Sequence, residues 1–124
     1  MYEVSVQTEF SSAHHVRGHE GKCATPHGHN WSVEVFFQGE TLTPIGMLED
    51  FRVLKEGVNK VLQRVDHKDL NALSDFEELN PTSENIARWL FMALSESMNG
   101  PRYRVSRVCV HEGPRTMASY WESP

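Results

Sequence analysis

Histidine is concentrated near the N-terminal end of this chain, in the part of the sequence whose residue types could do chemistry. Five of the seven histidines fall within residues 14–29: His14, His15, His19, His27 and His29. Imidazole nitrogens are common metal ligands and common proton carriers. Crowding of this kind predicts a metal site.

The spacing of three of these histidines would let them bind one ion. His27 and His29 are two residues apart, so in an extended strand their side chains leave the same face. His14 has the parity of the apolar residues before it, if that strand stays extended through Ser12. Three neutral imidazoles suit Zn²⁺ best among common intracellular metals, and three protein ligands with one open position are typical of catalytic zinc.

A second interpretation of the same histidines stays open on the residues alone. A single buried histidine is more often a hydrogen-bonded core residue than a ligand. We assign His15, His19 and His111 to that class. For His14, His27 and His29, the spacing supports metal binding and a core role equally.

The role of Cys23 decides which kind of zinc protein this would be. As a fourth ligand it would close the tetrahedron of a structural site, whereas a free thiolate beside the ion would be a base or nucleophile. An idle loop thiol is the third interpretation. The neighbours Lys22, Ala24 and Thr25 are not core-like, so we expect Cys23 to be accessible, and Lys22 would help to stabilise a thiolate. Spacing alone leaves the choice open.

Acidic residues in the second half offer further candidates. Asp66 directly precedes His67, and a carboxylate that orients an imidazole makes a proton relay, although a solvated helix end is the simpler interpretation. Glu84 falls in the first turn of a predicted helix, where an acid is stabilising anyway. Glu112 has the parity of two valines in its strand, so we expect it on the covered side of a sheet. A carboxylate there needs a partner, such as the adjacent N–H donors of an amino-pyrimidinone.

The elements that position these residues follow from hydrophobic periodicity. Alternation predicts strands over 2–10 and 29–38, and two more strands over Val105–Glu112 and Met117–Glu122. A second helix is predicted with Pro81 as a first-turn residue. Gly100 and Pro101 end that helix. A first helix of about four turns begins after an Asp50 N-cap, and its apolar stripe is Phe51, Leu54, Val58, Val61, Leu62 and Val65.

This ββααββ order predicts one α+β domain over residues 1–124, with an antiparallel sheet covered on one face by two helices. Phe36, Val105 and Cys109 would leave apolar character on the uncovered face. An open sheet also has two bare edges, and self-association would cover both the face and the edges.

Composition excludes several classes of function. Twelve basic and seventeen acidic residues give a formal charge of −5, so no general attraction to nucleic acid or to an anionic membrane is expected. The first residues, MYEVSVQTEF, lack the layout of a signal peptide, and no apolar run approaches the roughly 18 residues of a membrane helix. We expect a cytoplasmic protein in which Cys23 and Cys109 are free thiols.

Several segments together resemble the 6-pyruvoyl-tetrahydropterin synthase / 6-carboxy-tetrahydropterin synthase family. The matching segments, in chain order, are FSSAH, GHEGKCATPHGHNW, GMLEDF, VDHKDLN, NPTSENIARW and VHEG. The family often has glutamate where this chain has Leu79. The resemblance implies the tunnelling fold (T-fold), in which the ββααββ sheets of three subunits form a barrel and two trimers stack as a hexamer.

The resemblance also implies roles for residues of this chain. It places the zinc ligands on His14, His27 and His29, the catalytic cysteine on Cys23 outside the metal shell, and the catalytic Asp–His pair on Asp66 and His67 from a neighbouring subunit. It places the pterin-anchoring glutamates on Glu84 and Glu112, and further pterin-pocket positions on Thr82 and Ser83.

The Cys-x-x-x-His-Gly-His spacing is similar to that of bacterial 6-carboxy-tetrahydropterin synthases of the queuosine pathway. That branch implies a zinc-dependent lyase that converts 7,8-dihydroneopterin triphosphate to 6-carboxy-tetrahydropterin, acetaldehyde and triphosphate. The alternatives are a 6-pyruvoyl-tetrahydropterin synthase, a zinc hydrolase that does not need Cys23, and a non-catalytic zinc-stabilised assembly protein. Arg17 and Lys22 are candidates for meeting the triphosphate.

Overall fold

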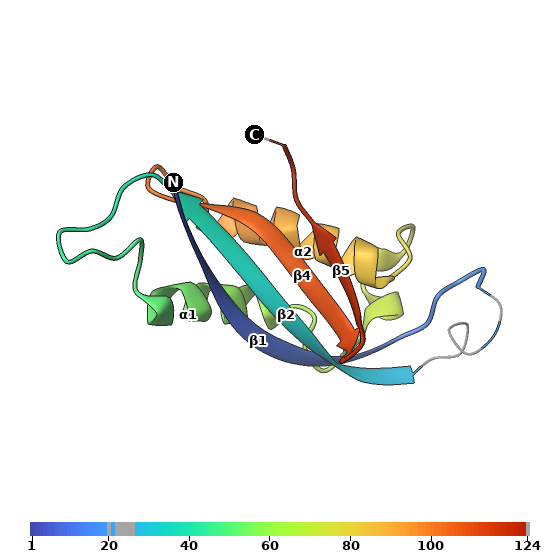
Figure 1. Cartoon of the computed structure of the whole chain (residues 1–124). Coiled ribbons are helices and arrows are strands. Elements are labelled where there is room, and N and C mark those ends of the chain that lie inside the picture. Colours follow the sequence, from blue (N-terminus) through green and yellow to red (C-terminus); the bar gives the residue numbers. More distant parts are fainter. Residues whose placement is uncertain (20, 22–26, 124) are drawn as a thin grey trace.

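The structure, a computed structural model, describes residues 1–19, 21 and 27–123 and has an α+β architecture. One twisted sheet packs against two α-helices that lie on the same face of it (Figure 1). The elements are β1 (Tyr2–His14), β2 (His27–Gly39), α1 (Phe51–Leu62), β3 (Lys68–Asp69), η2 (Leu70–Ala72), η3 (Ser74–Phe76), α2 (Ser83–Met98), β4 (Arg104–Gly113) and β5 (Thr116–Tyr120). The predicted ββααββ order is confirmed, with one short strand and two 3₁₀ turns added between the helices.

The sheet has the strand order β3-β1-β2-β4-β5. All neighbours are antiparallel except β3, which pairs parallel with β1 at Ser12 and Ala13. A two-residue strand is too short to show a hydrophobic period, which is why the sequence did not predict β3. β1 and β2 pair without a break from Tyr2–Gly39 to His14–His27, so β1 does stay extended through Ser12.

The core lies between the sheet and the helices. The buried faces of the helices consist of Leu54, Val58, Val61 and Leu62 from α1 and of Ile86, Ala87, Leu90, Phe91 and Leu94 from α2. Phe51, predicted to belong to the α1 stripe, is 56% exposed because it is the first residue of the helix and its side chain lies off the buried face. None of the described helices is long and apolar enough to cross a bilayer.

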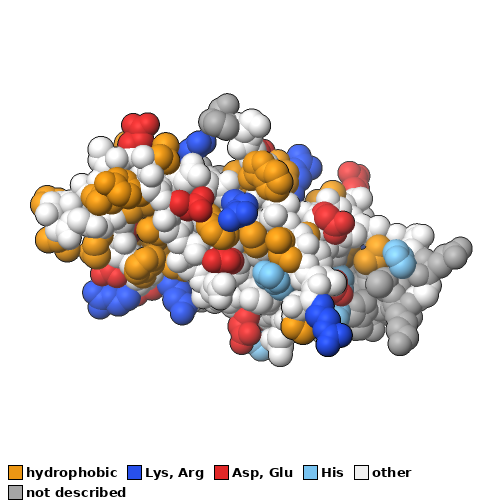
Figure 2. All heavy atoms as spheres, in the orientation of Figure 1, with side chains coloured by type: hydrophobic (Ala, Val, Ile, Leu, Met, Phe, Trp, Pro, Cys, Tyr) orange, Lys and Arg blue, Asp and Glu red, His pale blue; other side chains and the backbone are white. Residues whose placement is uncertain are grey.

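A register irregularity between β2 and β4 overturns one prediction about the sheet. Phe36 pairs with Arg107 but Phe37 pairs with Val105, so the parity of β4 changes between these two positions. Val105 therefore shares the helix-covered face with Val108 and is 2% exposed, whereas an unbroken alternation places it on the opposite face. The face away from the helices carries a mixture of charged, polar and apolar side chains (Figure 2).

The helix starts agree only in part with the predicted caps. Asp50 accepts a hydrogen bond from the Arg52 N–H at 2.8 Å and is the N-cap of α1, as predicted. The N-cap of α2 is Thr82, so Pro81 lies before the helix and not in its first turn. A Thr82 hydroxyl that accepts from the Asn85 N–H makes the better N-cap here, because the hydroxyl satisfies an otherwise unpaired donor. The α1 helix has 12 residues, a little over three turns.

The end of β2 packs too closely for any side chain at Gly39. A Cβ atom there would overlap the Arg102 carbonyl oxygen and lie 2.6 Å from Leu48 Cδ1. We expect Gly39→Ala to lower the free energy of unfolding by about 1–3 kcal/mol, measured by urea denaturation, because backbone must move. Gly100→Ala is the matched control, since its Cβ would meet nothing within 4 Å. Equal stability of the two variants would contradict the tight packing.

Candidate functional site

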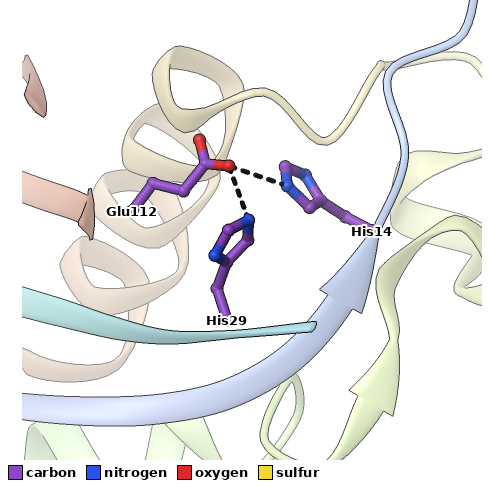
Figure 3. A group of neighbouring side chains, drawn as sticks. All are labelled: His14, His29 and Glu112. Carbon is purple, nitrogen blue, oxygen red and sulfur yellow. Dashed lines mark hydrogen bonds and ion pairs between the residues drawn. The ribbon is translucent and has the colours of Figure 1, made fainter. Parts of the chain in front are cut away.

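Three side chains from three strands meet at one end of the sheet (Figure 3). His14 ends β1, His29 lies near the start of β2, and Glu112 lies near the end of β4. One possible ligand atom from each lies within 4.8 Å of the others. Glu112 Oε1 is 3.3 Å from His14 Nε2 and 2.8 Å from His29 Nε2. The strand register produces this meeting, because Ser12 pairs with His29 and places His14 one step further along the same face.

The indole of Trp31 forms an apolar support for both histidines. Trp31 is fully buried, and its ring centroid lies 4.8 Å from that of His14 and 5.5 Å from that of His29, in edge-on geometry. Its Nε1–H donates to the Ser12 carbonyl at 3.3 Å, and the ring stacks on Phe10. A packed and hydrogen-bonded indole has one position, so both imidazoles rest on a rigid surface.

Hydrogen bonds to residues outside this group fix the orientation of His14 and Glu112. His14 Nδ1 lies 2.6 Å from the Pro81 carbonyl oxygen. A carbonyl can only accept, so Nδ1 carries the proton and Nε2 is the atom that faces Glu112. The Ser83 hydroxyl donates to Glu112 Oε2 at 3.3 Å, which holds the carboxylate from its other oxygen.

The group could hold a metal ion, and its donor types suit zinc. Two imidazole nitrogens with a third nitrogen or oxygen ligand are typical of zinc sites. Ligand atoms about 2.1 Å from a tetrahedral zinc lie roughly 3.4 Å from each other. The 3.3 Å separation of His14 Nε2 and Glu112 Oε1 has nearly this value, and the 2.8 Å separation of His29 Nε2 and Glu112 Oε1 needs to widen only slightly.

Of the predicted metal ligands, the structure brings His14 and His29 together. His27 is the backbone partner of His14 in the register, but its side chain lies outside the described residues, as does the whole of Cys23. The sequence did not suggest that Glu112 would contact the two histidines, although its parity placed it on the same face. That shared parity was the available signal.

The predicted pterin-pocket residues at the start of α2 lie in different surroundings. The Thr82 hydroxyl caps the helix, and the Ser83 hydroxyl contacts Glu112. Glu84 is exposed in the first turn. Arg17 donates to the Phe76 carbonyl at 2.9 Å, so its guanidinium is engaged within the chain and is a weaker candidate for binding phosphate.

Asp66 and His67 form a separate polar pair on the β3 side of β1. Asp66 Oδ1 accepts from the Ser11 N–H at 2.8 Å and lies 3.0 Å from His67 Nδ1. The Ser11 N–H, with a further contribution from His67, holds the pKa of the Asp66 carboxyl below its ordinary value despite some burial. His67 has a left-handed backbone (φ 56°) and a side chain that is 81% exposed. It lines a shallow depression of about 450 Å³ together with His29 and Lys68.

The fold and this site define a tunnelling-fold (T-fold) protein. The sequence profile described as 6-pyruvoyl tetrahydropterin synthase matches residues 3–123, and the chain belongs to this family. A solved structure of Caenorhabditis elegans 6-pyruvoyl tetrahydropterin synthase superposes with a TM-score of 0.87 at 30% identity, covering 98% of this chain and 96% of that one.

Relatives by sequence carry different names. An Archaeoglobus fulgidus protein provisionally named 6-carboxy-5,6,7,8-tetrahydropterin synthase is 41% identical over 104 residues, which cover 83% of this chain and 85% of that protein. The dihydroneopterin monophosphate aldolase of Pyrococcus furiosus is 35% identical over 107 residues, which cover 86% of each chain. Family membership therefore leaves the individual reaction to be argued from the site.

The Asp66 carboxylate should make stability depend on pH. A carboxyl whose pKa is depressed in the folded state contributes stability above its unfolded pKa of about 4, and this stability is lost as the pH falls through the folded value. We expect the free energy of unfolding of the native chain to exceed that of Asp66→Asn at pH 7, and the difference to shrink below pH 4. A difference that stays constant from pH 7 to pH 3 would contradict the assignment.

Proposed function

We propose that this chain is a zinc-dependent carbon–carbon lyase. The substrates are 7,8-dihydroneopterin triphosphate and one water molecule, and the products are 6-carboxy-5,6,7,8-tetrahydropterin, acetaldehyde and triphosphate, as in queuosine biosynthesis. The observation that carries this proposal is the convergence of His14 and His29 beside Glu112 in a member of a tetrahydropterin synthase family. We also propose that the protein is cytoplasmic.

The proposed zinc ligands are His14, His27 and His29. The register supports His27, because its backbone lies opposite His14 at the end of the same two strands. Three neutral imidazoles leave the full charge on the metal, whereas a glutamate ligand would reduce it. When bound, zinc would polarise the side-chain oxygens of the substrate and acidify the adjacent C–H bonds.

Glu112 is then the first proposed anchor of the pterin. Its Oε2 is held by Ser83, and a carboxylate can accept two parallel N–H bonds from an amino-pyrimidinone edge. Glu84 is the second proposed anchor, and Thr82 and Ser83 are proposed to line the pterin pocket. The proton carriers are Cys23 and the Asp66–His67 pair, in which the carboxylate orients the imidazole through a 3.0 Å contact.

The proposed assembly is a homohexamer made of two trimers. Among the residues that the structure describes, the outer edge of β1 is strand-paired only at Ser12 and Ala13, next to the contacts of Ser11 with Asp66 and His67, and β5 is the other edge of the sheet. Because strand direction alternates from β1 to β5, the β1 edge of a second copy can join β5 in antiparallel orientation. Exposed apolar residues lie along both edges: Met1 and Tyr2 beside β1, and Met117 and Trp121 beside β5.

Such pairing would also complete the active site. In antiparallel alignment, the C-terminal end of β1 from a second copy lies beside the first residues of β5. That end of β1 carries Asp66 and His67, which are bonded to Ser11, and the start of β5 follows Glu112 by a short turn. The exposed Asp66–His67 pair of one copy would therefore reach the group of His14, His29 and Glu112 in the next copy.

The zinc assignment predicts distinct losses for four variants. His14→Ala, His27→Ala and His29→Ala should each weaken Zn²⁺ binding at least about tenfold in competition with a chelator, because each removes a ligand. Glu112→Gln should leave Zn²⁺ affinity within about threefold and should raise KM instead. His111→Ala, which alters the opposite face of β4, is the matched control. Loss of zinc by Glu112→Gln alone, with His27→Ala unaffected, would make Glu112 the third ligand.

The reaction is tested by incubating the zinc-loaded protein with 7,8-dihydroneopterin triphosphate and identifying the products by mass spectrometry. Acetaldehyde release together with 6-carboxy-tetrahydropterin supports the lyase, whereas triphosphate elimination alone supports a 6-pyruvoyl-tetrahydropterin synthase. Dihydroneopterin monophosphate is offered in parallel, because of the Pyrococcus furiosus relative. Cys23→Ala should keep its zinc and lose turnover by about 10² or more. A variant that loses zinc and unfolds would identify a structural site, and one with nearly full activity would identify a zinc hydrolase.

A further inference from the structure

Beyond His14 the chain leaves the strand ladder, and two asparagine side chains take the place of the missing strand. Asn71 accepts from the His15 N–H at 2.9 Å and donates to the His15 carbonyl at 3.0 Å. Asn80 accepts from the Arg17 N–H at 3.0 Å and donates to the Arg17 carbonyl at 2.8 Å. Each carboxamide thus supplies one acceptor and one donor, as a paired strand residue would.

Asn80 also belongs to the turn that receives the His14 ring. The main-chain carbonyl of Asn80 accepts from the Thr82 N–H at 2.8 Å and from Asn85 Nδ2 at 2.9 Å. Both the side-chain amide and the main-chain carbonyl of Asn80 are therefore hydrogen-bonded. The next residue, Pro81, is buried, and its ring fixes φ. Its carbonyl is the one that lies 2.6 Å from His14 Nδ1.

These contacts form a closed loop of interactions around one proposed metal ligand. His14 is connected to Arg17 through the main chain, and Arg17 is connected to Asn80 by the two side-chain hydrogen bonds described above. Asn80 precedes Pro81, whose carbonyl contacts the His14 ring. His14 is 1% exposed, so water cannot replace a lost partner of Nδ1 without rearrangement. Asn71 holds the main chain at His15 but belongs to a different turn.

We propose that Asn80 is a positioning residue for the metal ligand His14. By clamping Arg17 and fixing the Pro81 carbonyl, Asn80 holds the Nδ1–H tautomer of His14 and aims Nε2 at the ion. This inference rests on the zinc site of the proposed function and adds a residue that does not touch the metal. Hydrogen bonds to the far nitrogen of a histidine ligand typically change metal affinity or activity by about 10–100-fold.

The test compares Zn²⁺ affinity, by chelator competition, for the native chain, Asn80→Ala, Asn80→Asp and Asn59→Ala. Asn80→Asp keeps the acceptor for the Arg17 N–H but loses the donor. The control Asn59 is a hydrogen-bonded asparagine of α1 that accepts from the Thr8 hydroxyl, away from the metal group. We expect about tenfold or greater weakening in Asn80→Ala, a smaller loss in Asn80→Asp, and a change below about twofold in Asn59→Ala.

A second readout separates positioning from general destabilisation. In zinc-loaded protein with ¹⁵N-labelled histidine, the exchange rate of the His14 Nδ1–H with water should rise in Asn80→Ala, while the rate at His29 should not change. If Asn80→Ala does not fold without zinc, the same measurement is made on Asn80→Asp at saturating Zn²⁺. Native-like zinc affinity together with a native-like exchange rate in both Asn80 variants would overturn the proposal.

The outcomes distinguish this inference from the function on which it rests. If the native chain binds no zinc, the metal part of the proposed function fails and the inference fails with it. If the native chain binds zinc and both Asn80 variants keep a native-like zinc affinity and a native-like His14 exchange rate, only the positioning role of Asn80 is overturned.

Discussion

The uninterrupted antiparallel pairing of β1 with β2 is the constraint on which the rest of this structure depends. Its register runs from Tyr2–Gly39 to His14–His27. A shift of one residue would turn every side chain of one strand to the opposite face. His14 would then leave the helix-covered side, and Phe10 would lose its stack on Trp31. The apolar pattern that builds the core and the histidines that could bind a metal are therefore fixed by the same ladder.

A second constraint is that buried polar groups need partners. His14 is almost fully buried, and its two nitrogens are directed to the Pro81 carbonyl and to Glu112. Glu112 is held in turn by Ser83 in the first turn of α2. The segment before α2 thus does more than connect two elements, because it supplies the polar surroundings that let an imidazole stay in a defined orientation beneath the helices.

Two parts of the proposed chemistry come from different elements of a single copy, although His29 and His67 line one shallow depression. The metal group lies at the end of β1, β2 and β4 on the covered face, whereas Asp66 and His67 lie beside the outer edge of β1. Open sheet edges and exposed apolar side chains lie where a second copy would have to join. An assembly that satisfies the edges would bring the two groups together, so stability and catalysis would depend on the same contacts.

Local residue patterns were sufficient to predict the long strands, the faces of their side chains and some of the helix ends. Alternation predicted the long strands, and the parity of His14, His29 and Glu112 placed all three on the covered face, because parity depends only on an extended backbone. Asp50 as a cap and the end of α2 near Gly100 also followed from local chemistry. These features depend on neighbours in sequence, and a sequence displays them directly.

Only the tertiary structure decided the features that depend on distant residues. The irregularity beside Phe36 reversed the expected face of Val105, since a pairing defect involves two strands that the sequence separates. Glu112 met two histidines from other strands, and Asn80 clamped Arg17, although these two residues are 63 positions apart in the sequence. The types and spacing of the residues determined which faces carry polar chemistry. The pairing of strands and turns determined which of those groups touch, because contact distances are set by the packing of the whole chain.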